Sequence, residues 1–193
     1  MKGIEKLTSV RLAEVLAQQG TVPSEAITEA LYAQDHLGEP FAEVLISGGH
    51  VGEWELAKLV AGHFQLPFIT AGNYEIDQEA QRRIGMELLF KHTIVPLDVF
   101  GDAVTVVMPV LTPYEVLEEI QRQHSCELFP YVGLVSENKK VLEAAFPGYQ
   151  EWVKSARLQQ DAGDKSPSGG ETADWMNIFD DADAKVRGSI LDH

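Results

Sequence analysis

Two polar side chains frame the first of two similar stretches of this sequence. Residues 11–34 begin with Arg11 and end with Gln34. The planar guanidinium of an arginine can grip a phosphate or the acceptor edge of a guanine with two parallel hydrogen bonds. A glutamine amide can both donate and accept at a base edge, and leucines between the two would supply apolar walls for a purine ring. These residue types suit noncovalent binding of a small ligand.

The second stretch, residues 40–63, repeats the first. Both stretches contain Ala-Glu-Val-Leu, followed by a glycine (Gly20 and Gly49) and a valine (Val22 and Val51). Apolar residues at helical spacing can make unrelated amphipathic helices look alike, but the shared tetrapeptide and glycine at one fixed offset favour a true repeat. Tandem helical units of this kind pack on each other or jointly enclose something.

Residue patterns that would support catalysis are missing. The stretch Gly163-Asp164-Lys165-Ser166 lacks the first glycine and the preceding strand of a phosphate-binding loop. The six histidines have no HExxH spacing, and Cys126 is the only cysteine, so a thiol metal cage is excluded. We therefore predict a binding module that is not an enzyme and has no metal or resident cofactor.

The composition describes an acidic globular protein. The 193 residues carry a net charge of -15 with 45% hydrophobic residues, a charge that repels nucleic acid and anionic membranes. Nothing approaches the roughly 18 consecutive apolar residues of a membrane span, and the amino terminus lacks a signal-peptide core. We expect a cytoplasmic protein that binds neither DNA nor RNA and does not insert into membranes.

The patterns along the chain predict an α+β fold in three parts. They are a helical tandem-repeat subdomain (1–65), a small α+β subdomain containing a sheet (66–150), and a flexible linker and tail (151–193). In the first part, Gly20 should end a helix in a left-handed turn. In the second part we expect short helices near 77–84 and 86–91, strands at 68–69, 93–99, 103–108 and 128–134, and helices at 112–123, capped by Thr112, and 136–146, capped by Ser136.

The tail contains an apolar cluster in polar, Gly/Ser-rich surroundings. Trp175, Met176, Ile178 and Phe179 follow the linker closely. Such a segment either docks into a groove of a partner protein or folds back onto its own domain, and the sequence leaves both open.

With these features assembled, the chain resembles the amino-terminal domain of the ATPases of type II secretion and type IV pilus assembly. That family includes the MshEN domain, which binds cyclic di-GMP through two tandem motifs of the form RLGxxLxxxGxxxxxxLxxxLxxQ. Residues 11–34 and 40–63 match these motifs, with residues 35–39 between them, and the likeness extends over roughly residues 8–146. The sequence has no Walker motif, so the resemblance implies a stand-alone version without the ATPase domain.

The resemblance assigns thirteen positions to the ligand. They are Arg11, Leu12, Ala13, Leu16, Gly20, Ile27, Leu31 and Gln34 in the first copy, and Ala42, Leu45, Gly49, Leu56 and His63 in the second. Alanine replaces the motif glycine in both copies, and Ile27 replaces a leucine. The second copy departs further, because Pro40 stands at the arginine position and His63 at the glutamine position.

Two functions remain open from the sequence. One is a receptor that senses cyclic di-GMP through residues 11–63 and regulates a secretion or pilus machine. The other is a docking adaptor of the same machinery that has lost the nucleotide, with contacts in residues 93–146 and in the Trp175–Phe179 segment. The preserved first copy favours the receptor and the altered second copy favours the adaptor.

Overall fold

The structure is a computed structural model that describes residues 4–163, with side chains placed through residue 156. The described residues up to Trp152 form one compact unit, and those from Val153 to Gly163 belong to a second. The apolar segment Trp175, Met176, Ile178 and Phe179 lies outside the described residues.

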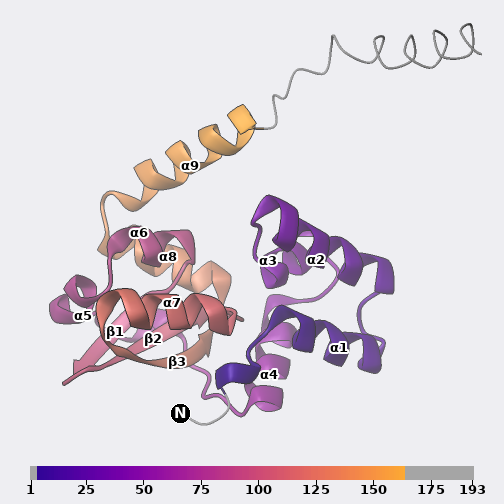
Figure 1. The fold of residues 1–193 in the computed structure, drawn as a ribbon, viewed down its shortest axis with the longest axis horizontal. Coiled ribbons are helices and arrows are strands. Elements are labelled where there is room, and N and C mark those ends of the chain that lie inside the picture. Colours follow the sequence, from indigo (N-terminus) through magenta and orange to yellow (C-terminus); the bar gives the residue numbers. More distant parts are fainter. Residues whose placement is uncertain (1–3, 164–193) are drawn as a thin grey trace, which may run out of the picture. The chain divides into compact units, whose positions relative to one another are not determined.

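The repeat folds into two helix–turn–helix units, as the sequence predicted (Figure 1). A short 3₁₀ turn, η1 (Ile4–Lys6), precedes α1 (Ser9–Gln19) and α2 (Ser24–Leu37), which form the first copy, and α3 (Phe41–Ser47) and α4 (Glu53–Phe64) form the second. Gly20 ends α1 in the left-handed region at φ 66°, and Gly49 follows α3 at φ 70°. A side chain at these angles would be strained, which explains why both copies keep a glycine there.

The second part is a three-stranded sheet with helices around it. Its elements are η2 (Ala71–Asn73), α5 (Gln78–Arg83), α6 (Met86–Lys91), β1 (Val95–Phe100), β2 (Ala103–Pro109), α7 (Tyr114–His124), β3 (Glu127–Gly133) and α8 (Val135–Ala145). The strands lie in the order β1-β2-β3; β1 and β2 form an antiparallel hairpin, and β3 runs parallel to β2 after the α7 crossover. The α+β class is confirmed.

The two faces of the sheet differ in burial. Alternate residues such as Val104, Val106 and Leu128 are buried on one face. On the other face α8 covers one end, where the amide of Asn138 donates to the carbonyl oxygen of Val107 at 2.9 Å. The remaining end of that face, toward the β1–β2 turn, is open.

Both predicted helix caps were wrong, because residues distant in sequence bind these helix ends instead. The backbone N–H of Tyr114 at the start of α7 donates to the carbonyl oxygen of Leu7, and the buried Thr112 hydroxyl has no hydrogen-bond partner. Ser136 lies inside the first turn of α8, where Glu53 of the repeat accepts from both its backbone N–H and its hydroxyl. Neither contact can be read from local spacing.

Two further expectations changed in extent. The strand at 68–69 is reduced to a single parallel bridge between Phe68 and Val132. The segment expected to be a flexible linker from residue 151 is helical over its first part, because α9 spans Tyr149–Gly163. The helix start is anchored by aromatic packing, with the Trp152 ring centroid 5.9 Å from that of Phe90.

Candidate functional site

Arg11, which opens the first motif, is exposed on α1. Its Nη1 donates to Glu14 Oε2 at 2.7 Å, and both side chains remain about half exposed, at 52% and 51%. Exposed pairs of this kind contribute at most about 1 kcal/mol. The guanidinium could therefore exchange Glu14 for an anionic ligand at little cost.

Gln34, which closes the first motif, has a structural partner. Its side-chain oxygen accepts a hydrogen bond from the hydroxyl of the buried Ser9, so it ties the end of α2 to the start of α1. The amide nitrogen is the part of Gln34 that remains to donate to a ligand.

Most apolar motif positions form the core of the repeat. Seven of them are buried: Leu12, Ala13, Leu16, Ile27, Ala42, Leu45 and Leu56. Leu31 is half-buried. These residues pack the two copies together whether or not a ligand is present, so their burial does not separate the receptor from the adaptor.

The glycines act through backbone conformation. Nothing lies within 4 Å of the position that a Cβ would take at Gly20 or Gly49. The space beside these turns is therefore open to the approach of another molecule, while the positive φ angles account for the glycines themselves.

A groove of about 500 Å³ lies where the first copy meets the last helix of the second. We call it the repeat groove; it is lined by Leu16, Gln19, Thr21, Val51, Glu55, Leu56, Lys58, Leu59, Gly62 and His63. Its volume is within the range of small-molecule sites, and it combines an apolar floor with polar side chains at the rim.

The repeat groove brings together only part of the predicted site. Leu16, Leu56 and the exposed His63 line it, whereas Arg11 and Gln34 are not among its lining residues. It adds Gln19, Thr21 and Lys58, which the sequence analysis did not select. A signal was available for two of them, because Gln19 and Thr21 flank the motif glycine Gly20.

Charge in the repeat groove is balanced rather than strongly attractive. Lys58 is the only lysine or arginine in the lining, and Glu55 contributes a carboxylate. A doubly charged phosphate ligand would therefore rely on Lys58 within the groove, since Arg11 lies outside the lining.

Three features of the described part of the chain bear on metal binding, thiol reactivity and membrane insertion. Residues 4–163 contain no group of three His, Cys, Asp or Glu side chains that could hold a metal ion. Burial raises the pKa of the Cys126 thiol, opposed by the charge of Arg83, so this thiol is protonated at neutral pH. No helix among these residues is long and apolar enough to cross a bilayer.

The architecture defines a class of domain in which two helix–turn–helix units are followed by a small mixed sheet with helices around it. The comparisons with known proteins identify that class. Residues 64–147 match the family model of the MshEN domain. No curated protein matches the sequence.

Two solved structures share the fold. A structure of MshE with cdg has 20% sequence identity and a TM-score of 0.53, covering 69% of this chain and 97% of that one. The N-terminal domain of XpsE has 19% identity and a TM-score of 0.54, covering 74% of this chain and 96% of that one.

Residues 64–147 thus match the MshEN domain model, and the fold is that of the MshE and XpsE amino-terminal domains, which confirms the resemblance inferred from the sequence. The segment matched by the family model begins at Phe64, after the repeat. The family match therefore lies in the sheet part of the molecule, while the thirteen ligand positions remain predictions.

Proposed function

We propose that this protein is a non-catalytic regulatory module of a type II secretion or type IV pilus system, and that it senses cyclic di-GMP through residues 11–63. One observation carries the proposal: the two motif copies fold into adjacent helix–turn–helix units that leave the repeat groove open between α1 and α4. The similarity in fold to MshE, which has been solved with cdg, supports the same conclusion.

Different residues of the repeat groove would bind different groups of the nucleotide. The ammonium of Lys58 would bind a phosphate, and Gln19, Thr21 and His63 would supply hydrogen bonds to base and ribose edges. Arg11 would add a second cation by releasing Glu14.

Ligand binding could change the position of α8, which packs on the sheet, through two contacts between the second copy and α8. Glu53, at the start of α4, binds the backbone and hydroxyl of Ser136 at 2.7 Å each, and Glu43 of α3 pairs with Lys139. Since α4 also lines the repeat groove, a ligand that shifts α4 would act directly on the beginning of α8.

Calorimetric titration of the full chain with cyclic di-GMP tests the proposal. We expect saturable binding, weakened about tenfold or more by Lys58→Ala, since hydrogen bonds to charged groups contribute about 1.5–3 kcal/mol. Arg11→Ala should weaken binding less, because Arg11 lies outside the groove lining. Arg122→Ala on α7 removes the same charge elsewhere and should leave binding unchanged. Equal losses in all three variants would indicate nonspecific charge attraction and contradict the proposed site.

The docking adaptor is the second candidate, and one observation favours it. Where the first copy opens with Arg11 and Leu12, the second has Pro40 and Phe41, and Phe41 is only 2% exposed. The second copy therefore has no cation at the position that Arg11 occupies in the first, because the exposed Pro40 carries no charge. Absence of binding heat from folded protein at high cyclic di-GMP concentration would reject the receptor and leave the adaptor.

A further inference from the structure

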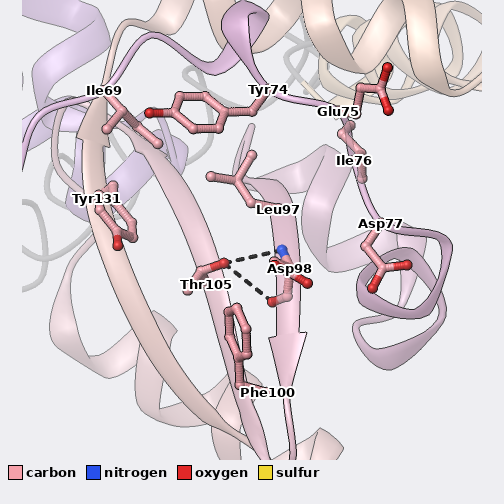
Figure 2. A pocket seen from close by; sticks show the side chains of 10 residues that line it. All are labelled: Ile69, Tyr74, Glu75, Ile76, Asp77, Leu97, Asp98, Phe100, Thr105 and Tyr131. Atoms are coloured by element: carbon pink, nitrogen blue, oxygen red, sulfur yellow. Dashed lines mark hydrogen bonds between the residues drawn. The ribbon is translucent and has the colours of Figure 1, made fainter.

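A second groove, of about 450 Å³, lies on the open end of the sheet (Figure 2). We call it the sheet groove. It is lined by Ile69, Tyr74, Glu75, Ile76, Asp77, Leu97, Asp98, Phe100, Thr105 and Tyr131. None of these residues belongs to the repeat; five of them fall within residues 93–146, the block assigned to the adaptor, but none was selected individually from the sequence.

The strand register determines which side chains form the floor of the sheet groove. Asp98 pairs with Thr105, and Thr105 pairs in turn with Phe129, so these three side chains share one face. The register of β1 shifts at Leu97, and the Thr105 hydroxyl bonds to the backbone N–H and carbonyl of Asp98, at 3.1 and 3.2 Å. This bulge turns Asp98 onto the same face as Phe100 and Tyr131.

Aromatic rings are exposed around this floor. Tyr74 is 52% exposed and Phe100 is 66% exposed, while Tyr131 is half-buried. Figure 2 shows the Tyr74 ring coming from the loop before α5, Tyr131 from β3 and Phe100 from the end of β1. Ring faces in a groove provide a surface on which a cation can stack.

Charge in the sheet groove is of one sign. Its lining has three carboxylates, Glu75, Asp77 and Asp98, and no lysine, arginine or histidine. One oxygen of Asp98 accepts from the backbone N–H of Val99, and one of Asp77 accepts from that of Glu79. Within residues 4–163 none of the three carboxylates forms an ion pair, so charge remains to attract a cation.

The backbone N–H groups along the edge of β3 beside the groove already have hydrogen-bond partners, which limits how a partner protein could bind. The backbone of Val132 pairs with the chain at Pro67 and Ile69, Pro130 has no N–H, and the N–H of Leu128 is bound by the Gln121 side chain. Strand addition at this edge is therefore blocked, and recognition would depend on side chains in the groove.

We propose that the sheet groove binds an arginine side chain presented by a partner protein. The guanidinium would stack on the exposed rings and bond to the Asp98 and Asp77 carboxylates, a combination that a planar cation satisfies better than an ammonium. The acidity of the whole chain favours a basic protein segment and disfavours a nucleic acid. This site is separate from the repeat groove and does not require a nucleotide.

Backbone NMR of the full chain, titrated with two capped peptides, tests the proposal. The peptides are acetyl-Gly-Arg-Leu-Gly-amide and the same sequence with citrulline, which keeps the shape of arginine without its charge. We expect saturable shifts of Tyr74, Asp98, Thr105 and Tyr131 amides with the arginine peptide alone. Asp98→Asn should weaken binding about twofold to fivefold, the range for an exposed charge pair.

The acidic surface of α7 provides the matched control. Glu115, Glu118 and Glu119 lie there with Arg122 beside them, in a lining without aromatic rings. Glu118→Gln should leave peptide binding unchanged, and Phe100→Ala should weaken it. Equal shifts with the citrulline peptide, or shifts as large on α7 as in the sheet groove, would overturn the proposal. A titration with no saturating shifts in the sheet groove would also overturn it.

Discussion

Replacing Glu53 with alanine should destabilise the protein through α8, a helix far away in the sequence. Glu53 Oε1 accepts from the Ser136 N–H and Oε2 from the Ser136 hydroxyl, both at 2.7 Å. The carboxylate therefore caps the positive end of α8 with two charge-assisted hydrogen bonds.

The magnitude follows from the exposure of this contact. Hydrogen bonds to charged groups contribute about 1.5–3 kcal/mol when shielded, but water reaches both partners here, so we expect about 1–2 kcal/mol in total. The melting temperature should fall by roughly 2–8 °C, given about 2–4 °C per kcal/mol for a domain of this size. Glu53→Gln keeps an acceptor and should lose about half as much.

Urea denaturation followed by circular dichroism measures the effect, with Glu55→Ala as the control. Glu55 lies in the same first turn of α4, so its loss changes the charge near the start of α4 in the same way without touching α8. A double-mutant cycle with Ser136→Ala should give a coupling of at least about 0.5 kcal/mol. Identical losses for Glu53→Ala and Glu55→Ala, with no coupling to Ser136, would refute the cap.

Three further predictions concern the sheet part, and a fourth, at Gly62, concerns α4 of the repeat. Thr105→Val removes both hydrogen bonds to the Asp98 backbone and should cost about 1–2 kcal/mol of unfolding free energy, measured in urea. Gly133→Ala should cost about 2 kcal/mol or more, because its Cβ would lie 2.3 Å from a valine methyl of β2. Gly62→Ala, in open space on a helix, should instead stabilise by about 0.5–1 kcal/mol; similar effects at both sites would contradict this steric argument. Burial, with help from the adjacent Lys91 charge, lowers the pKa of His92 from 6.5 to about 4. The unfolded chain therefore binds this proton more readily, so the contribution of His92 to stability is present above pH 6.5 and is lost as the pH falls toward 4. Proton NMR should place the midpoint near 4; a midpoint near 6.5 would contradict it.

The sequence by itself determined the local elements. Gly20 and Gly49 mark left-handed turns and apolar residues mark the faces of α1–α4, because helices and turns depend on neighbours within a few residues. The same holds for the strands predicted at 93–99 and 103–108, because Gly101-Asp102 between them is a local hairpin signal. The motif spacing also carried the MshEN resemblance, since a repeat can be found without knowing how its copies pack.

The sequence could not select which motif residues line a cavity. Leu16 and His63 line the repeat groove and Arg11 does not, although all three occupy motif positions. The difference arises from the way α4 packs beside the end of α1, which depends on contacts between the two copies.

Only the tertiary structure decided the long-range contacts. The cap of α8 joins Glu53 to Ser136, and no local pattern marks either residue as the partner of the other. The sheet groove unites Tyr74, Asp98 and Tyr131 because β3 returns parallel to β2 and a bulge reorients β1. Side chains on different strands become neighbours through register, and register is fixed when the whole apolar face is buried together.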